Sequence, residues 1–212
     1  MFVRSIMKPS YKCIVSSSNQ QIGDVLSKLD KYEIQATPIV DDQTFMGMIS
    51  RQIIYRAFFH SELDKGAFLE QKLSDTLLTN QDLYIDEDEV FEKTLPIFKD
   101  FPILAVANKD KNFLGIISRF DVLEQFESAF GAKKKGLRIA FTSEESEGRV
   151  ARLADIIDQL HANIISITSF DETDKLARRI VIKINHVDHP NMQKIKRKFE
   201  KSGFRILDIK EI

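Results

Sequence analysis

The chain has 212 residues, 43% of them hydrophobic and 30% charged, which is typical of a folded protein with one to three domains. A net charge of -1 supplies no basic surplus to neutralise phosphates, so we expect no nucleic acid polymer as a partner. The single cysteine, Cys13, excludes an internal disulfide framework and favours a reducing, cytoplasmic setting. We expect no signal peptide and no membrane partner, because no apolar run approaches the roughly 20 residues of a membrane span.

The first 60 residues alternate between helical and extended patterns. Apolar residues at the spacing of one helix face predict a helix over 22–29, and the short apolar run 36–40 predicts a buried strand. A turn at 41–44 and a second strand at 45–50 follow, and a second helix has its apolar face within 53–58. This order predicts a small layered unit of strands and helices.

The same plan recurs further along the chain. Gly115 lies 68 positions after Gly47 (115 − 47 = 68), and this offset places an equivalent of each element without a gap. Each copy is interpreted as a strand-helix-strand-strand-helix (βαββα) unit. Because a unit this small buries little apolar surface alone, we expect the two copies to pack into one body. The elements of the second copy are a helix over 90–98, a strand at 103–107, a turn at 108–112, a strand at 113–118 and a helix over 122–126.

A seven-residue motif carries the most chemical information in the repeat. The first copy has Gly-Met-Ile-Ser-Arg-Gln-Ile over 47–53, and the second has Gly-Ile-Ile-Ser-Arg-Phe-Asp over 115–121. At a strand-to-helix junction, Ser118 can cap the helix, whose free N–H groups attract anions, and Arg119 offers a planar fork for phosphate. Asp121 can accept hydrogen bonds from two ribose hydroxyls. The motif therefore indicates a site for a phosphate and a ribose.

Residues 137–212 follow a different plan, after a segment at 131–136 with three lysines between two glycines, which we interpret as a solvated linker. Strands are predicted at 137–141, 163–170, 177–184 and 204–209, with helices over 150–160 and 189–201. The order βαββαβ is the ferredoxin-like plan. The residues predicted to face inward are Val150, Leu153, Ala154, Ile157 and Leu160 on the first helix, and Met192, Ile195 and Phe199 on the second.

The doubled unit resembles the CBS domain, a family that occurs in tandem pairs and binds adenine-containing ligands. The resemblance covers about residues 1–130 and is carried by the repeated motif and by Thr37-Pro38-Ile39-Val40-Asp41. The tail looks like an ACT domain, a regulatory βαββαβ module. The fold class that this implies is α+β or α/β, a tandem CBS pair followed by a ferredoxin-like ACT domain. The expected domains are CBS 1 at 1–60, a connector at 61–72, CBS 2 at 73–131, a linker at 132–136 and the ACT-like domain at 137–212.

In CBS pairs, one cleft combines the acidic motif of one copy with the start and the middle strand of the other copy. Carried over to this sequence, the resemblance implies a site in which an apolar slot holds the base, polar groups meet its edge, and cations meet the phosphate. The implied nucleotide-binding residues are Lys12, Ile14, Ile34, Gln35, Ala36, Thr37, Ser118, Arg119 and Asp121. The alternative is structural, because Ser118 and Asp121 can serve only as helix caps and Arg119 can be a surface residue.

The two clefts of the pair are not expected to be equivalent. Ile53 occupies the position of Asp121 in the first copy, and an isoleucine cannot accept hydrogen bonds from ribose. The second cleft is therefore predicted to bind a nucleotide poorly or not at all. For the first cleft, AMP, ADP, ATP, S-adenosylmethionine and cyclic di-AMP are all candidates. Lys12 and Arg119 favour cyclic di-AMP, which has no free 3′-hydroxyl and so gains less from Asp121 and more from cations.

ACT domains often bind amino acids at a dimer interface, through the loop after the first strand and the start of the second strand. Gly148 matches the loop glycine of the family, and Asn163 matches the asparagine before the second strand. The loop departs from the family pattern, since Glu147 replaces the usual proline. Gly148 and Asn163 are therefore possible amino-acid-binding residues. The alternatives are that Asn163 fixes a tight turn and that the module serves only for dimerisation.

We expect no enzymatic activity, because no nucleophile, phosphate-loop or metal-ligand motif is present and the four histidines are dispersed. The pair His186 and His189 is interpreted as part of a surface turn. The sequence predicts a cytoplasmic, homodimeric receptor without a cofactor, which signals to an unidentified partner protein when an adenine nucleotide rearranges the CBS pair. The alternatives are an AMP, ATP or S-adenosylmethionine sensor, an amino-acid-responsive ACT regulator with empty CBS clefts, and a purely structural dimerisation protein.

Overall fold

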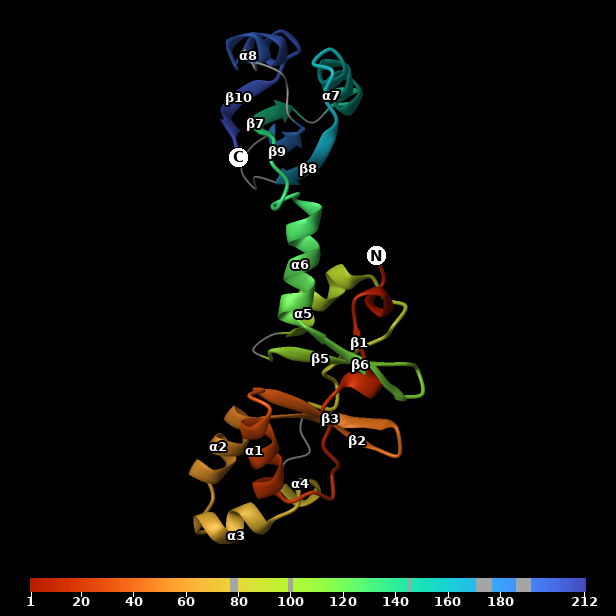
Figure 1. Cartoon of the computed structure of the whole chain (residues 1–212), viewed down its shortest axis with the longest axis vertical. Coiled ribbons are helices and arrows are strands. Elements are labelled where there is room, and N and C mark those ends of the chain that lie inside the picture. Colours follow the sequence, from red (N-terminus) through yellow and green to blue (C-terminus); the bar gives the residue numbers. More distant parts are fainter. Residues whose placement is uncertain (77–79, 99–100, 145, 171–176, 186–191) are drawn as a thin grey trace. The chain divides into compact units, whose positions relative to one another are not determined.

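A computed structural model describes residues 1–76, 80–98, 101–144, 146–170, 177–185 and 192–212 (Figure 1). Its contacts divide the chain into an N-terminal unit, Met1–Leu123, and a C-terminal unit, Glu124–Ile212. Helix α6 (Arg119–Ala129) contains the boundary. The other elements of the N-terminal unit are β1 (Lys8–Pro9), α1 (Ile22–Lys31), β2 (Ala36–Asp41), β3 (Thr44–Ser50), α2 (Arg51–Phe59), α3 (Lys65–Glu70), α4 (Leu73–Thr76), β4 (Tyr84–Ile85), α5 (Thr94–Phe98), β5 (Ile103–Ala107) and β6 (Phe113–Ser118).

The first copy of the repeat forms the predicted strands and helices. The helical spacing that predicted α1 buries Ile22, Val25 and Leu29 completely, because these side chains share one face of the helix. They pack against the hairpin of β2 and β3 and against α2. The segment 61–72, expected to be a polar connector, contains α3, whose Phe68 is buried in the same core. The connector therefore contributes to the packing of the first copy.

The strand order of the N-terminal unit links the two copies. One sheet has the order β1-β6-β5-β4, and the other is the β2-β3 hairpin. Strand β1 belongs to the first copy by sequence, yet it pairs antiparallel with β6 of the second copy, with Pro9 opposite Gly115. A Cβ atom on Gly115 would fall well inside van der Waals contact of the Lys8 carbonyl oxygen. This close approach of two backbones explains why the second motif begins with glycine.

The two copies also share a hydrophobic core, as predicted from their small size. Phe45 and Met48 of β3 are buried against Ala105 and Ala107 of β5 and against Phe113 of β6. The β2-β3 turn and the β5-β6 turn exchange backbone hydrogen bonds, with the amide of Phe45 donating to Lys111 and that of Phe113 donating to Gln43. The prediction that the copies pack into one body is confirmed.

The C-terminal unit has the predicted ferredoxin-like order. Its strands form one antiparallel sheet with the order β10-β7-β9-β8, and its two helices lie on one side of that sheet (Figure 1). The core between sheet and helices includes a cluster of Phe141, Phe199 and Phe204. The elements are β7 (Leu137–Glu144), α7 (Arg149–Asp158), β8 (Ile164–Phe170), β9 (Ala177–Ile184), α8 (Met192–Lys201) and β10 (Arg205–Glu211).

The inward face predicted for α7 is partly wrong. Leu153 and Ile157 are buried as predicted, but Ile156 joins them, while Ala154 is exposed and Val150 is 71% exposed. Val150 lies in the first turn of the helix and lines a surface pocket outside the core. Helical spacing alone therefore could not predict that its side chain is exposed. The start of the helix predicted at 189–201 and the proposed turn at His186 and His189 lie outside the described residues.

The segment 131–136 was expected to be solvated, and its glycines are not. Gly131 is buried, and Gly136 exchanges two backbone hydrogen bonds with Ile212. The lysines between them are exposed, and Lys133 pairs with Glu127 at 2.9 Å. The segment is therefore anchored to the C-terminal unit at both of its glycines. Within the described ranges, no helix has the length and apolarity needed to cross a membrane.

Candidate functional site

A cleft of about 260 Å³ lies between the two copies of the repeat in the N-terminal unit. One side comes from the start of the chain and the entry to β2, and the other comes from β5, β6 and the start of α6. The predicted residues Ile14, Ile34, Gln35, Ala36 and Ser118 are brought together here. The residues that line the cleft are Lys8, Ile14, Ile34, Gln35, Ala36, Pro102, Ile103, Ile116, Ser118 and Phe120.

The lining of the cleft is mostly apolar, with a few polar groups at its margin. Ile14 and Ile34 of the first copy are half-buried and share the cleft with Ile103 and Ile116 of the second copy. These branched side chains form a slot that suits a flat ring, which buries apolar surface on both of its faces. Gln35 is exposed beside the slot and offers an amide that can donate and accept hydrogen bonds.

Thr37 was predicted to meet the edge of a base, and it lies behind the cleft instead. Its side chain is fully buried, and its hydroxyl donates to the Ile14 carbonyl at 2.7 Å. Thr37 is not among the residues that line the cleft. Its position within β2 points it toward the segment that carries Ile14, so it holds one wall of the slot in place.

Ser118 and Asp121 form a reciprocal cap at the start of α6. The Ser118 amide and hydroxyl both donate to Oδ2 of Asp121, at 2.7 and 2.6 Å, and the Asp121 amide donates to the Ser118 hydroxyl oxygen at 3.1 Å. This capping box satisfies donors that the first turn of a helix leaves without partners. None of these bonds uses Oδ1 of Asp121. The structural role predicted for the pair is therefore present. Ser118 lines the cleft, whereas Asp121 is not among the lining residues.

The two arginines of the repeated motif have different environments. Arg51 donates to the carbonyls of Leu29 and Ile34, at 2.6 and 3.2 Å, and pairs with Asp30 at 2.7 Å. It therefore fastens the end of α1 to the segment that enters the cleft. Its counterpart Arg119 is exposed, and its guanidinium carbon lies 6.0 Å from the centre of the Phe98 ring. Arg119 does not line the cleft.

The cation in the cleft is Lys8, where the sequence pointed to Lys12. Lys12 is exposed, with its ammonium 5.6 Å from the centre of the Tyr11 ring, and it does not line the cleft. Lys8 does so because β1 crosses to pair with β6. Burial raises the pKa of the neighbouring Cys13 thiol, against the opposing effects of Lys8 and the Ile116 backbone. Cys13 is thus a weak nucleophile, and its thiol donates to the Lys8 and Pro9 carbonyls.

Phe120 is another cleft residue that was not predicted from the sequence, as are Pro102, Ile103 and Ile116. It lies in the first turn of α6, between Arg119 and Asp121, and it is 74% exposed. An aromatic ring left in solvent at the mouth of an apolar slot is suited to stack on a flat ligand. Its position in the motif, directly after the Ser-Arg pair, is the sequence feature from which a place at the cleft could have been predicted.

The residues proposed for amino-acid binding do not come together within one chain. Gly148 has φ = 77° and directly precedes α7, whereas Asn163 follows that helix. The ten residues of α7 separate them by about 15 Å along its axis. The backbone of Asn163 pairs with Asn185, its amide donating to Oδ1 and its carbonyl accepting from the Asn185 amide. The turn role predicted as an alternative for Asn163 is consistent with these bonds.

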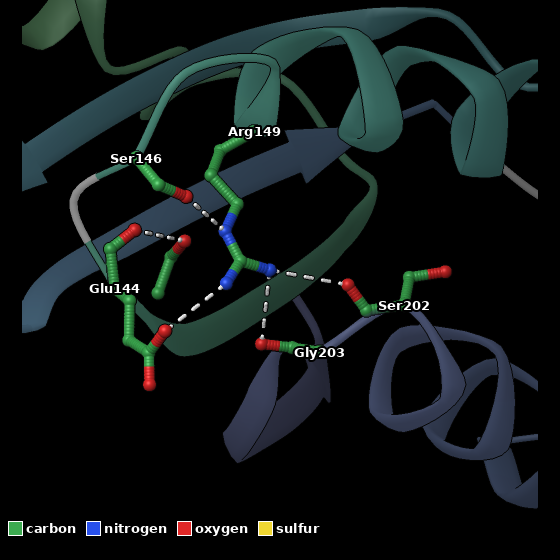
Figure 2. Close-up of polar contacts among 6 residues, drawn as sticks. Glu144, Ser146, Arg149, Ser202 and Gly203 are labelled. Carbon is green, nitrogen blue, oxygen red and sulfur yellow. Dashed lines mark hydrogen bonds and ion pairs between the residues drawn. The ribbon is translucent and has the colours of Figure 1, made fainter.

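Arg149, next to Gly148, organises the loop after β7. Figure 2 shows its guanidinium at the centre of a set of acceptors: Ser146 Oγ at 3.0 Å, Glu144 Oε2 at 3.4 Å, and the carbonyls of Ser202 and Gly203 at 3.3 and 3.4 Å. The guanidinium also lies over the Phe204 ring, at 5.7 Å from its centre. These contacts fasten the loop to the end of α8. The donors of Arg149 are thereby engaged within the protein, which favours a structural role.

No group of three or more histidine, cysteine and acidic side chains with metal-binding geometry occurs among the residues that the structure describes. The candidate binding site is therefore the cleft of the N-terminal unit. It combines an apolar slot, a helix start and, among the described lining residues, one cation, which is an arrangement for binding an anionic ligand with a flat ring.

Comparisons with known proteins find a family match within this unit. The model of the CBS domain family matches residues 3–60, and no curated protein matches the chain. A CBS domain-containing protein of unknown function from Bacillus anthracis is 25% identical, with a TM-score of 0.53 over 60% of this chain and 93% of that one. Two more distant structures share the fold. CBSX2 in complex with AMP is 22% identical, with a TM-score of 0.51 over 59% of this chain and 95% of its own. CbpB in complex with c-di-AMP is 18% identical, with a TM-score of 0.53 over 60% and 85%. Residues 3–60 therefore match the CBS domain family, and the N-terminal unit shares its fold with a CBS domain-containing protein.

Proposed function

We propose that this chain is a non-catalytic regulatory protein whose N-terminal unit binds an adenine nucleotide, with cyclic di-AMP as the favoured ligand. The observation that carries the proposal is the cleft between the copies, where an apolar slot faces the start of α6. The complexes of CBSX2 with AMP and of CbpB with c-di-AMP support this choice of ligand class. Binding shifts the equilibrium between two arrangements of the pair, and a partner protein responds to the difference.

Each part of an adenine nucleotide has a counterpart in the cleft. The base enters the slot between Ile14 and Ile34 on one side and Ile103 and Ile116 on the other. The phosphate lies near the start of α6, where backbone N–H groups and the helix dipole favour negative charge, and near the ammonium of Lys8. The Ser118 hydroxyl, which lines the cleft, serves the ribose together with Asp121 Oδ1, which takes no part in the cap and lies in the same first turn of α6 as Phe120.

The size of the cleft bears on the choice between a mononucleotide and a cyclic dinucleotide. A volume of about 260 Å³ lies just below the range of roughly 300–1,000 Å³ for small-molecule sites, so it accommodates one nucleoside. The second adenosine of cyclic di-AMP then lies at the mouth of the cleft, where the exposed ring of Phe120 is available for stacking. AMP uses the slot and leaves that ring unoccupied.

Isothermal titration calorimetry with AMP, ATP, S-adenosylmethionine and cyclic di-AMP tests the proposal. We expect binding with one ligand site per chain, because Ile53 provides no acceptor for ribose in the second cleft. Absence of binding for all four ligands contradicts the proposed function. Two equivalent sites per chain contradict the assignment of a single working cleft.

The Lys8→Met variant is expected to lose about tenfold in affinity for the nucleotide, because a charge-assisted hydrogen bond to phosphate contributes roughly 1.5 kcal/mol or more. Lys12→Met is the matched control, since it removes the same charge from a residue four positions away that does not line the cleft. Titration of both variants with the same nucleotide measures the difference. Equal losses in the two variants contradict the assignment of the phosphate to Lys8.

The Asp121→Asn variant separates the two kinds of ligand. Its side-chain oxygen still accepts the Ser118 bonds and preserves the helix cap, but it interacts more weakly with ribose hydroxyls than a carboxylate does. We expect the affinity for AMP, which has free 2′ and 3′ hydroxyls, to fall severalfold, and that for cyclic di-AMP to change less. The ratio of the two dissociation constants, measured by calorimetry, checks this. An unchanged ratio removes Asp121 from the ribose site.

A further inference from the structure

The sheet of the C-terminal unit has a second face, opposite the one that α7 and α8 cover. Along β9, Ile182 and Ile184 enter the core, so the alternate residues Arg179, Val181 and Lys183 lie on the other face. A pocket of about 400 Å³ is present there, within the size range of small-molecule sites. It is lined by Phe130, Ala132, Arg138, Ser166, Thr168, Phe170, Arg179, Val181, Lys183 and Ile212.

Lys183 is a buried cation in the wall of this pocket. The residue is only 3% exposed, and its ammonium donates to the carbonyl of Gly131 at 2.9 Å. An ammonium has three N–H donors. Within the described part of the chain, the Gly131 carbonyl is the acceptor for the Lys183 ammonium. Among the described residues no carboxylate pairs with it. A buried charge is strongly destabilised unless it is paired. An anionic ligand bound beside Lys183 would supply this pairing.

The other charged residues of the pocket have the same sign. Arg138 and Arg179 also line it, and none of the lining residues that the structure describes is acidic. Arg138 pairs with Asp208 at 3.2 Å on the neighbouring strand, and its side chain is partly exposed. The charged side chains in the described lining are therefore all cations, and since Lys183 is the buried one, an anion beside it is favoured over a cation.

The uncharged residues of the lining indicate which chemical group is attached to the anion. Phe130, Phe170, Val181 and Ile212 present apolar surface, and Ser166 uses its hydroxyl to donate to the Phe130 carbonyl at 2.9 Å. Such a wall binds an aromatic or aliphatic group by removing its surface from water. A bare inorganic anion makes no use of it.

We propose that this pocket binds a small organic carboxylate, with the carboxylate paired to Lys183 and the apolar body packed against Phe130 and Phe170. The site differs from the cleft of the N-terminal unit and from the loop of Gly148, which contribute none of its lining residues. A free α-amino acid is disfavoured, because its ammonium group would lie among Lys183, Arg138 and Arg179, the charged residues of the described lining. The ligand class is thus a carboxylic acid without an amine.

Isothermal titration calorimetry of the full chain with 3-phenylpropionate tests the proposal. Two related compounds serve as probes of charge: 3-phenylpropan-1-ol, which lacks the negative charge, and phenylalanine, which adds an ammonium. We expect 3-phenylpropionate to bind at one site per chain and at least tenfold more tightly than either compound. Equal affinity for the alcohol, or tighter binding of phenylalanine, overturns the proposal, as does the absence of binding.

Substitutions locate the site. Lys183→Met is expected to weaken 3-phenylpropionate binding at least tenfold. Lys210→Met, in the same sheet opposite Arg138 but outside the pocket lining, is expected to leave binding unchanged. If Lys183→Met does not fold, as judged by circular dichroism, Arg179→Gln at the exposed rim replaces it, with a severalfold loss expected. Unchanged binding in the folded pocket variant overturns the assignment. In the presence of a saturating adenine nucleotide, 3-phenylpropionate is still expected to bind. This control distinguishes binding at the C-terminal pocket from binding at the N-terminal cleft.

Discussion

Replacing Gly115 with alanine is expected to lower the free energy of unfolding of the N-terminal unit by about 1–3 kcal/mol, the usual effect of overpacking. The new methyl group meets the backbone carbonyl of Lys8, which cannot rotate away as a side chain can. The pairing of β1 with β6 must therefore separate or shift. Because β1 carries Lys8 into the cleft, we expect nucleotide affinity to fall in the same variant.

Urea denaturation and calorimetric titration measure the two effects on Gly115→Ala. Gly66→Ala is the matched control, since Gly66 lies inside α3 and its added Cβ meets only the end of the Asp64 side chain. Alanine in a helix is favoured over glycine by up to about 1 kcal/mol, so the control is expected to be neutral or slightly stabilised. If both variants behave alike, close approach is not the reason for glycine at position 115.

Gly115 illustrates how far the sequence could predict this fold. The repeat offset located α5, β5, β6 and α6 of the second copy, because periodic apolar residues and turn residues are local signals. It did not locate the short strand β4 or helix α4. The partner of β1 is not a local signal. A strand of two residues has no periodicity to recognise, and its pairing with β6, more than 100 positions away, depends on the assembled tertiary structure.

The same limit explains the differences at the cleft. Ile14, Ile34, Gln35 and Ala36 were predictable because the family resemblance places them on contiguous segments of the first copy. Lys8, and not the predicted Lys12, lines the cleft, because the pairing of β1 with β6 determines which lysine lies there. Thr37 alternates with Ala36 along β2 and so faces away, a distinction that required the register of the strand.

At the start of α6, the sequence offered two interpretations, capping and ligand binding, as though they excluded each other. The geometry allows both. The capping box occupies Oδ2 of Asp121 and fixes the carboxylate, while Oδ1 takes no part in it. A carboxylate held in one orientation before a ligand arrives loses less entropy on binding. The cap thus serves the proposed ribose contact.

In the C-terminal unit, the pattern predicted the elements and part of the helical side of the core, and it did not predict the second face of the sheet. Alternation along a strand identifies which residues share a face, yet Lys183 looks like an ordinary solvated lysine in the sequence. It is buried because Gly131 and its neighbours, expected to be solvated, pack against that face. A buried cation of this kind becomes visible only when nonlocal segments are placed together.

Replacing Phe199 with alanine is expected to destabilise the C-terminal unit by about 3–5 kcal/mol, the range for removing a fully buried phenylalanine. Phe199 is completely buried and packs against Phe141 and Phe204, with ring centres 5.2 and 5.9 Å away. For a unit of this size, such a change lowers the melting temperature by about 10 °C or more. Differential scanning calorimetry measures the shift.

Phe170→Ala is the matched control, because Phe170 lies in the same unit and is 48% exposed. We expect its stability to change by less than about 1 kcal/mol. The core around Phe199 contains no residue of the N-terminal unit, so AMP or cyclic di-AMP should still bind to the Phe199→Ala variant at temperatures where the C-terminal unit has melted. Loss of that binding together with the C-terminal transition would show that ligand binding depends on the C-terminal unit. This result would contradict a cleft formed by the two copies of the repeat alone.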